Sequence, residues 1–149
     1  MTKLLVIADD FTGALDTGIQ FAREGTKTCV AIGADGVLAS RADYPVIVID
    51  SETRHLPHGE AYETVCRLVN EARAAGVGYI YKKTDSALRG CVGAELSAAL
   101  DAWPDADELA FVPAFPKVRR TTKGGTQYID GVPVSESAFG RDPFEPVRH

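Results

Sequence analysis

Length, composition and charge exclude several classes of protein before any motif is considered. The chain has 149 residues, the size of one average domain, with 45% hydrophobic and 25% charged residues, which is typical of a globular protein. No apolar run approaches the length of a membrane span, and a net charge of -5 argues against a surface that coats nucleic acid. The three widely spaced cysteines match neither a disulfide framework nor a zinc pattern, so a reduced, cytoplasmic setting is expected, with no membrane or nucleic acid as partner.

Five short apolar runs predict the strands of one sheet. Each is nearly continuous in Val, Ile, Leu and Ala, as in strands that are covered on both faces. Helical periodicity separates most of them, and this alternation predicts an α/β fold with a doubly wound, mainly parallel, Rossmann-like sheet. The expected strands are residues 4–8, 28–32, 45–49, 78–81 and 109–112.

Three helices are expected between these runs, each with an apolar stripe that should face the sheet. Residues 33–43 fit only a short helix. In chain order, the three stripes are Phe11, Leu15, Ile19 and Ala22; Ala61, Val65, Leu68, Val69 and Ala72; and Val92, Leu96, Ala99 and Leu100.

The last quarter of the chain differs from the rest. Residues 1–112 carry 10 Lys and Arg against 17 Asp and Glu, whereas residues 113–149 carry 6 against 4 and hold five of the eight prolines. Helical periodicity fails there. Gly124-Gly125, a β-rich stretch and Asp130-Gly131 predict an irregular C-terminal β-hairpin extension, with Pro133 in an edge strand.

Polar residues follow four of the five expected strands. Ligands of open parallel sheets bind at the carboxyl ends of the strands, so these polar stretches should share one rim. They are residues 9–13, 50–54, 82–90 and 113–122. Carboxylates, hydroxyls and cations converging on one rim indicate a site for a small polar ligand.

Asp9 and Asp10 stand directly after the first expected strand. Adjacent acids in this position can hold Mg²⁺, accept hydrogen bonds from sugar hydroxyls, or act as a general base toward an alcohol. Alternatively, one of them caps the following helix. The pattern favours a functional role for Asp10 and leaves Asp9 open.

Residues 82–90 combine Lys83, Asp85, Ser86 and Arg89 near an expected helix start. Free amides together with Lys and Arg make an anion site for a carboxylate or phosphate. Asp85 beside these cations should stay ionised and able to orient or deprotonate a hydroxyl, unless it or Ser86 only caps the helix. Lys82 is expected to be solvated.

Ser51 and Arg54 follow the third expected strand and could grip a small carboxylate, although a turn with a solvated arginine is an equal alternative. His55 and His58 have no third ligand at metal spacing, so no metal site is predicted. The sequence has neither GxxxxGK[ST] nor a GxGxxG after the first strand, and therefore no recognisable nucleotide cradle.

Five motifs occur in a fixed order along essentially the whole chain: ADDFTGALDTG, the Ser-Glu-Thr-Arg turn, KKTDSALRG, PAFP with RTT, and YIDGVPVSESAF with DPFEPV. Together they resemble the four-carbon acid sugar kinase family, which includes the D-threonate, D-erythronate and 3-oxo-tetronate kinases. KKTDSALRG is more similar to the pattern of the threonate and erythronate kinases than to that of the 3-oxo-tetronate kinases. One departure is Arg119, where the family pattern has Gly.

The resemblance implies that residues 1–149 form an N-terminal acid-sugar-binding domain, itself incomplete, of a kinase whose C-terminal ATP-binding domain is absent. The implied reaction is phosphorylation of the terminal hydroxyl of a threonate- or erythronate-like acid by ATP with Mg²⁺, and this chain alone is expected to be inactive. A homo-oligomer is a possible assembly. The implied substrate-site residues are Asp10, Ser51, Arg54, Lys83, Asp85, Ser86, Arg89 and Arg120, with Asp85, in preference to Asp10, as the proton acceptor.

Two alternatives stay open. The chain could be a non-catalytic module that binds an acid sugar. A receiver domain of the phosphoacceptor type would also place acids after the first strand and an Asp, here Asp50, after the third. However, a receiver domain would not need the basic, proline-rich last quarter, and this part of the chain therefore argues against a receiver.

Overall fold

The main sheet has four parallel strands. The computed structural model describes residues 1–33, 36–143 and 145–148. The strands are β1 (Leu4–Ala8), β2 (Thr28–Ile32), β3 (Val46–Asp50) and β4 (Tyr79–Lys83), in the order β2-β3-β1-β4. The two central strands, β1 and β3, are almost entirely buried, as their continuous apolar sequences require.

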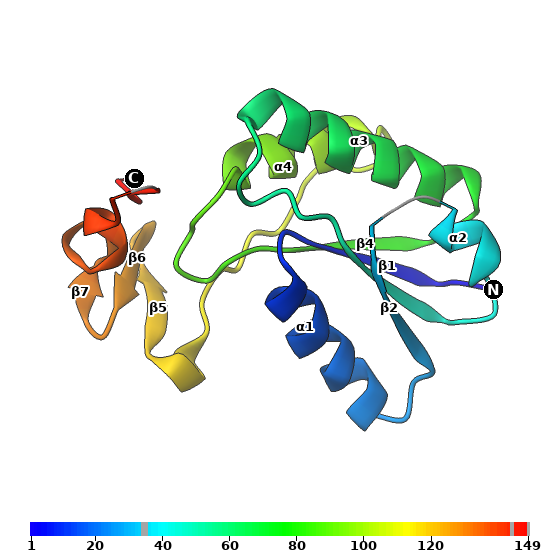
Figure 1. Ribbon diagram of the computed structural model, residues 1–149, viewed down its shortest axis with the longest axis horizontal. Coiled ribbons are helices and arrows are strands. Elements are labelled where there is room, and N and C mark those ends of the chain that lie inside the picture. The colour runs from blue at the N-terminus through cyan, green and yellow to red at the C-terminus, as the bar shows by residue number, and fades with distance from the viewer. Residues whose placement is uncertain (34–35, 144, 149) are drawn as a thin grey trace.

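Helices cover both faces of this sheet (Figure 1). α1 (Phe11–Arg23) packs on one face, whereas α3 (His58–Ala74) and α4 (Val92–Asp101) lie together on the other. The prediction of a doubly wound, parallel α/β fold is therefore confirmed. Within the expected short helix at 33–43, α2 spans Val37–Ser40, and residues 34 and 35 lie outside the described part of the chain.

A separate antiparallel sheet follows, beyond the carboxyl ends of the main strands (Figure 1). It consists of β5 (Arg120–Lys123), β6 (Thr126–Ile129) and the edge strand β7 (Val132–Pro133). The predicted hairpin is confirmed in β6 and β7, and β5 adds a third strand to it. Three 3₁₀ turns flank it, at Pro116–Val118, Val134–Glu136 and Phe139–Arg141.

The expected strand at residues 109–112 is wrong, because this described segment is irregular and β4 is left as an edge strand. Phe111 is 42% exposed and Val112 is 80% exposed, so neither face of the segment is covered as a sheet would cover it. Apolar content alone does not make a strand, since a strand also needs a hydrogen-bonding neighbour and a covering layer.

The buried face of α3 matches its predicted stripe residue for residue. The predicted face of α1 is wrong, because Phe11, Leu15 and Ile19 are exposed. Its buried residues are Gly13, Ala14, Thr17 and Gly18, and those of α4 are Glu95, Ala98 and Ala99. Small residues allow α1 to approach the sheet closely, since a Cβ on Gly18 would lie only 2.6 Å from Cγ2 of Val30.

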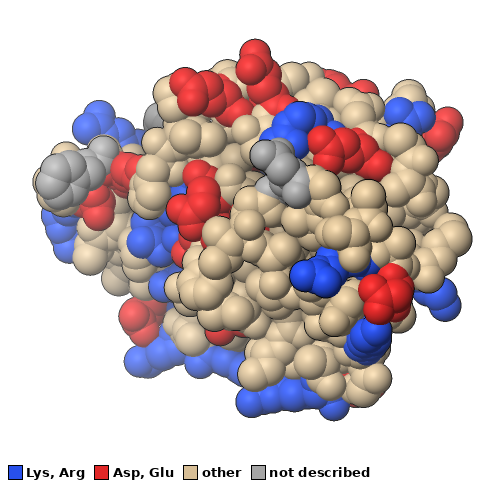
Figure 2. All heavy atoms as spheres, turned by 45° about the vertical axis from the view of Figure 1, so that its right-hand side comes forward, with Lys and Arg blue, Asp and Glu red and all other residues tan. Residues whose placement is uncertain are grey.

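None of the helices in the described ranges combines the length and the apolar character that crossing a bilayer requires. On the face drawn in Figure 2, acidic and basic side chains are interspersed around a broad uncharged area.

Candidate functional site

The parallel register brings three strand ends level with one another. Ala8, the last residue of β1, is paired with Asp50 on β3 and with Lys83 on β4. The residues that follow each strand therefore meet on one rim, as the sequence predicted for an open parallel sheet.

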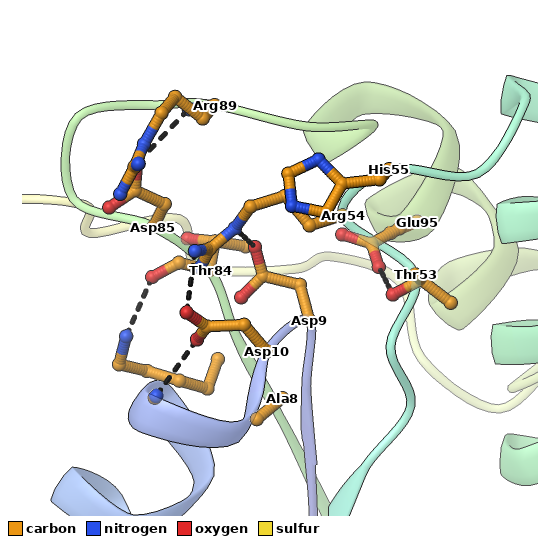
Figure 3. Close-up of polar contacts among 12 residues, drawn as sticks. Ala8, Asp9, Asp10, Thr53, Arg54, His55, Thr84, Asp85, Arg89 and Glu95 are labelled. Atoms are coloured by element: carbon orange, nitrogen blue, oxygen red, sulfur yellow. Dashed lines mark hydrogen bonds and ion pairs between the residues drawn. The ribbon is translucent and has the colours of Figure 1, made fainter.

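Arg54 lies at the centre of this rim, between the two acids that follow β1 (Figure 3). Its Nε donates to Asp9 Oδ2 at 2.8 Å and one terminal nitrogen donates to Asp10 Oδ2 at 2.5 Å. Its side chain is only 8% exposed, so the solvated alternative is wrong. Burial alone would lower the pKa of Arg54, but the hydrogen bond and charge of Asp9, together with Asp10, raise it, and the guanidinium stays charged.

The loop that leads into α4 passes directly against Arg54. Gly90 adopts φ +87°, and a Cβ at this position would lie 3.1 Å from the backbone oxygen and Cγ of Arg54. Only glycine combines this left-handed conformation with so close an approach. The backbone of residues 84–91 is thereby held against the buried arginine.

Asp10 has two roles at once. Its Oδ1 accepts a hydrogen bond from the backbone nitrogen of Gly13 at 2.8 Å and so caps α1, while its other oxygen contacts Arg54. The capping alternative is therefore correct for Asp10, without excluding a ligand, because the side chain remains 27% exposed. The side chain of Asp9 is only 1% exposed and contacts Arg54 beneath the rim.

Asp85 forms ion pairs with two further arginines. Arg89 Nε lies 2.5 Å from Asp85 Oδ2, and Arg120, from β5, lies 3.3 Å from Oδ1 and donates to Ser86 Oγ at 2.8 Å. Burial raises the pKa of Asp85, but the hydrogen bond and charge of Arg89 outweigh it and hold this pKa below its usual range. Asp85 is therefore ionised, as predicted.

The small antiparallel sheet is hydrogen-bonded to the loop that follows β4. Gln127 of β6 donates from Nε2 to the backbone oxygen of Ser86 at 2.6 Å and accepts from Thr122 Oγ1. Together with Arg120, it ties the C-terminal region to the rim. Arg119 adopts φ +57°, a left-handed conformation that favours glycine, which is the residue expected here from the family pattern.

These side chains line the polar end of a cleft of about 1370 Å³ that runs between α1, β4, α4 and residues 108–118. Seven of the eight predicted site residues line it: Asp10, Arg54, Lys83, Asp85, Ser86, Arg89 and Arg120. Lys83 lies on the α1 side of the sheet, with its Nζ donating to the backbone oxygen of Thr84 at 2.8 Å. The structure does not place Ser51 in the cleft; its hydroxyl donates to the backbone oxygen of Ala8 and contacts Thr53.

A buried polar network beneath the rim was not predicted from the sequence. The side chain of Lys82, expected to be solvated, is only 2% exposed, and its Nζ lies 3.2 Å from Oε1 of Glu95, whose side chain is 1% exposed. Glu95 also accepts from Thr53 (Figure 3). Thr53 in turn contacts Ser51. Two sequence features could have indicated this network, namely Glu95 among the alanines of α4 and Lys82 within a strand. Taken singly, however, each is typical of a surface residue.

The acids of the rim are engaged by arginines and are not gathered around a metal position. Asp9 Oδ1 and Asp50 Oδ2 are buried without a hydrogen-bond partner, but no group of three His, Cys, Asp or Glu in the described ranges could hold a metal ion. Asp9, Asp10 and Asp85 are instead engaged by arginines. The charge compensation at this rim comes from guanidinium groups.

An open parallel sheet with a charged rim at its carboxyl ends defines an α/β domain of the small-ligand-binding class. The chain belongs to the family described as the sugar-binding N-terminal domain, which matches residues 4–149. It is 40% identical to the D-threonate kinase of Salmonella typhimurium, over 97% of this chain and 34% of that protein. It is 34% identical to the D-erythronate kinase of Heliobacterium modesticaldum, over 99% of this chain and 34% of that protein.

A similar fold occurs in a crystal structure from Bordetella bronchiseptica, described as a domain of unknown function with bound citrate and as a domain-swapped dimer. The TM-score is 0.91 at 39% identity, and the match covers 98% of this chain and 37% of that chain. The chain thus spans about a third of the length of the relatives that it matches.

Proposed function

We propose that this chain is the substrate-binding part of an ATP-dependent four-carbon acid sugar kinase, acting on a threonate- or erythronate-like acid. The observation that carries the proposal is the convergence of Lys83, Arg89 and Arg120 with Asp10 and Asp85 at one end of a single cleft. A sugar acid needs cations for its carboxylate and acceptors for its hydroxyls, and this rim offers both. The kinase relatives and the citrate bound to the Bordetella protein support the same ligand class.

The geometry suggests how the ligand would be oriented. The carboxylate would bind the outward edges of Arg89 and Arg120, while Asp10 and Asp85 accept hydrogen bonds from hydroxyls. In phosphoryl transfer, an aspartate mainly positions the attacking hydroxyl and accepts its proton late, so the low pKa of Asp85 does not disqualify it. We therefore keep Asp85 as the first candidate for this role and Asp10 as the second.

ATP and Mg²⁺ would be bound by a part of the longer protein that this chain does not include. Among the described residues no group of three His, Cys, Asp or Glu could hold a metal ion, and the sequence has no phosphate-binding loop. A homo-oligomer is also proposed, supported by the domain-swapped dimer of the Bordetella protein. A receiver function is disfavoured because Asp50, the residue that would be phosphorylated, is 0% exposed.

Calorimetry of the chain with D-threonate and D-erythronate tests the proposal. Binding of at least one acid is expected, and Asp85→Asn and Arg89→Ala should each weaken it about tenfold or more, because each change breaks charged hydrogen bonds. Asp107→Asn and Arg23→Ala are matched controls on exposed residues outside the cleft and should leave affinity unchanged. The absence of binding to either acid would contradict the proposed function.

An ATP turnover assay separates the kinase part from a complete enzyme. The chain alone should bind the acid without consuming ATP. Turnover by the chain alone would contradict the proposal that this chain only binds the substrate. If the chain binds the acid but even longer versions of the protein show no ATP turnover, the non-catalytic module is favoured.

A further inference from the structure

An aromatic ring from the C-terminal region lies against both arginines that hold Asp85. The centroid of the Phe139 ring is 5.3 Å from Cζ of Arg89 and 5.1 Å from Cζ of Arg120. Both distances fall within the range of about 6 Å over which a guanidinium is attracted to the face of a ring. Arg89 lies in the loop after β4 and Arg120 in β5, so one ring contacts arginines from two separate parts of the fold.

The backbone around this ring is firmly held. The Phe139 nitrogen donates to Ser137 Oγ at 3.1 Å, and its oxygen accepts from the nitrogen of Val147 at 3.0 Å. The Ser137 hydroxyl donates to the oxygen of Val134, and Val134, Ser137 and Val147 are all at least 92% buried. The ring is therefore presented from an ordered segment, which reduces the entropic cost of keeping it in place.

The two arginines need such support because they carry like charges and share one partner. Arg89 contacts Oδ2 of Asp85 and Arg120 contacts Oδ1, so one negative charge faces two positive charges. Both arginines are also partly open to solvent, at 32% and 23% side-chain exposure. Without further contacts, either could swing into water, where long side chains gain rotamer freedom. A ring contact holds the guanidinium plane while its edge N–H groups stay available to a ligand.

We propose that Phe139 is a positioning residue that holds Arg89 and Arg120 at Asp85, ready for the carboxylate of the ligand. The proposal rests on the proposed function, since it assigns the ring a part in that same site. It also gives the C-terminal region a role in recognition, beyond closing the rim.

The first test is calorimetry of Phe139→Leu, which keeps an apolar side chain but removes the ring. Affinity for the sugar acid should fall about fivefold to tenfold, the loss expected from two ring–cation contacts. Phe139→Tyr should restore it to within about twofold, because the ring is retained. Phe11→Leu is the matched control, as Phe11 is an exposed phenylalanine of α1 outside the cleft. Unchanged affinity in Phe139→Leu, or failure of the tyrosine to rescue, would overturn the proposal.

The second test does not depend on ligand binding. In ¹⁵N-labelled chain, the Nε–H signals of Arg89 and Arg120 should shift in Phe139→Leu and exchange faster with water, but remain near their original positions in Phe139→Tyr. Unchanged signals would overturn the positioning role even if the acid binds. If the signals change as expected and the unmodified chain binds no acid, the ring–arginine contact stands and the proposed function fails.

Discussion

Helix α3 covers the main sheet in a different way from helices α1 and α4. α3 buries branched side chains, with Val65, Leu68 and Val69 all at 0% exposure. α1 and α4 bury mostly small residues and leave several large ones between 36% and 46% exposed, namely Phe11, Leu15, Ile19 and Leu100. An apolar stripe on a helix therefore does not always mark its packed face. Where a second stripe of small residues allows closer contact with the sheet, that stripe can be the one buried.

The group formed by α1, β4 and α4, which we call the β4 flank, also buries charged side chains, whereas every buried residue of α3 is apolar. Lys82 and Glu95 are buried at 2% and 1% exposure between β4 and α4. Burial lowers the pKa of Lys82, and the charge of Glu95 opposes this effect. The β4 flank thus replaces part of an apolar core with an ion pair, and it is also the side that opens into the cleft.

The largest effect is expected when this ion pair is broken. Lys82→Ala leaves the Glu95 carboxylate buried without its cation and should lower the free energy of unfolding by about 3–5 kcal/mol. Urea denaturation measures the loss. The double variant Lys82→Met with Glu95→Leu removes both charges and should recover most of the stability, since buried ion pairs are often replaceable by apolar pairs. A double variant as unstable as the single one would show that the network is required as a unit.

The α3 side could be predicted from the sequence because its stripe has no competitor. Val65, Leu68 and Val69 are large, and no second stripe on α3 is small enough to pack more closely. In α1, the spacing of Gly13, Ala14, Thr17 and Gly18 also forms a stripe, and periodicity of hydrophobic residues gives it little weight.

The candidate site was predictable to the extent that strand ends determine it. Asp10, Arg54 and Asp85 follow directly from the carboxyl-end rule. Ser51 lies on the same rim but faces the backbone of Ala8, a direction that no spacing rule specifies. Phe139 comes from the small sheet region, whose position depends on long-range contacts such as that of Gln127 with Ser86.

The next effect compares one leucine from each region. Leu68→Ala should cost about 3 kcal/mol, because it removes buried methyl groups and leaves a cavity under α3. Leu15→Ala should cost less than about 0.5 kcal/mol, because Leu15 is already 44% exposed on α1. Thermal and urea unfolding give both values. Equal losses would mean that the α1 stripe is covered in solution, for example by another copy of the chain.

A smaller effect separates two carboxylates by their opposite pKa shifts. Burial, with Glu52 nearby, raises the pKa of Asp50 to about 6, whereas the pKa of Asp85 is lowered, mainly because Arg89 outweighs its burial. The folded chain keeps a proton on Asp50 that the unfolded chain releases from about pH 4, so ionisation of Asp50 should reduce the free energy of unfolding by about 2 kcal/mol as pH rises from 4 to 6. The contribution of Asp85 has the opposite sign and is lost as pH falls below about 4.

Asp50→Asn isolates the first of these contributions. The difference in unfolding free energy between the variant and the unmodified chain should grow in favour of the variant from about pH 4.5 to 6.5 and then level off. Asp107→Asn, at an exposed position, should show no such trend. A difference that stays constant with pH would mean that Asp50 ionises normally in the folded chain.

The smallest effect reverses its sign between the two regions. Gly18 of α1 packs so closely on β2 that a Cβ would lie 2.6 Å from Cγ2 of Val30, a stiff β-branched side chain. Gly18→Ala should therefore lower stability by about 1 kcal/mol, because overpacking outweighs the gain in helix propensity. Gly59 of α3 has no atom within 4 Å of the same position, so Gly59→Ala should raise stability by about 0.5 kcal/mol. A gain in both variants would show that α1 can move off the sheet without cost. In that case, small-residue packing would not explain why its large side chains face outward.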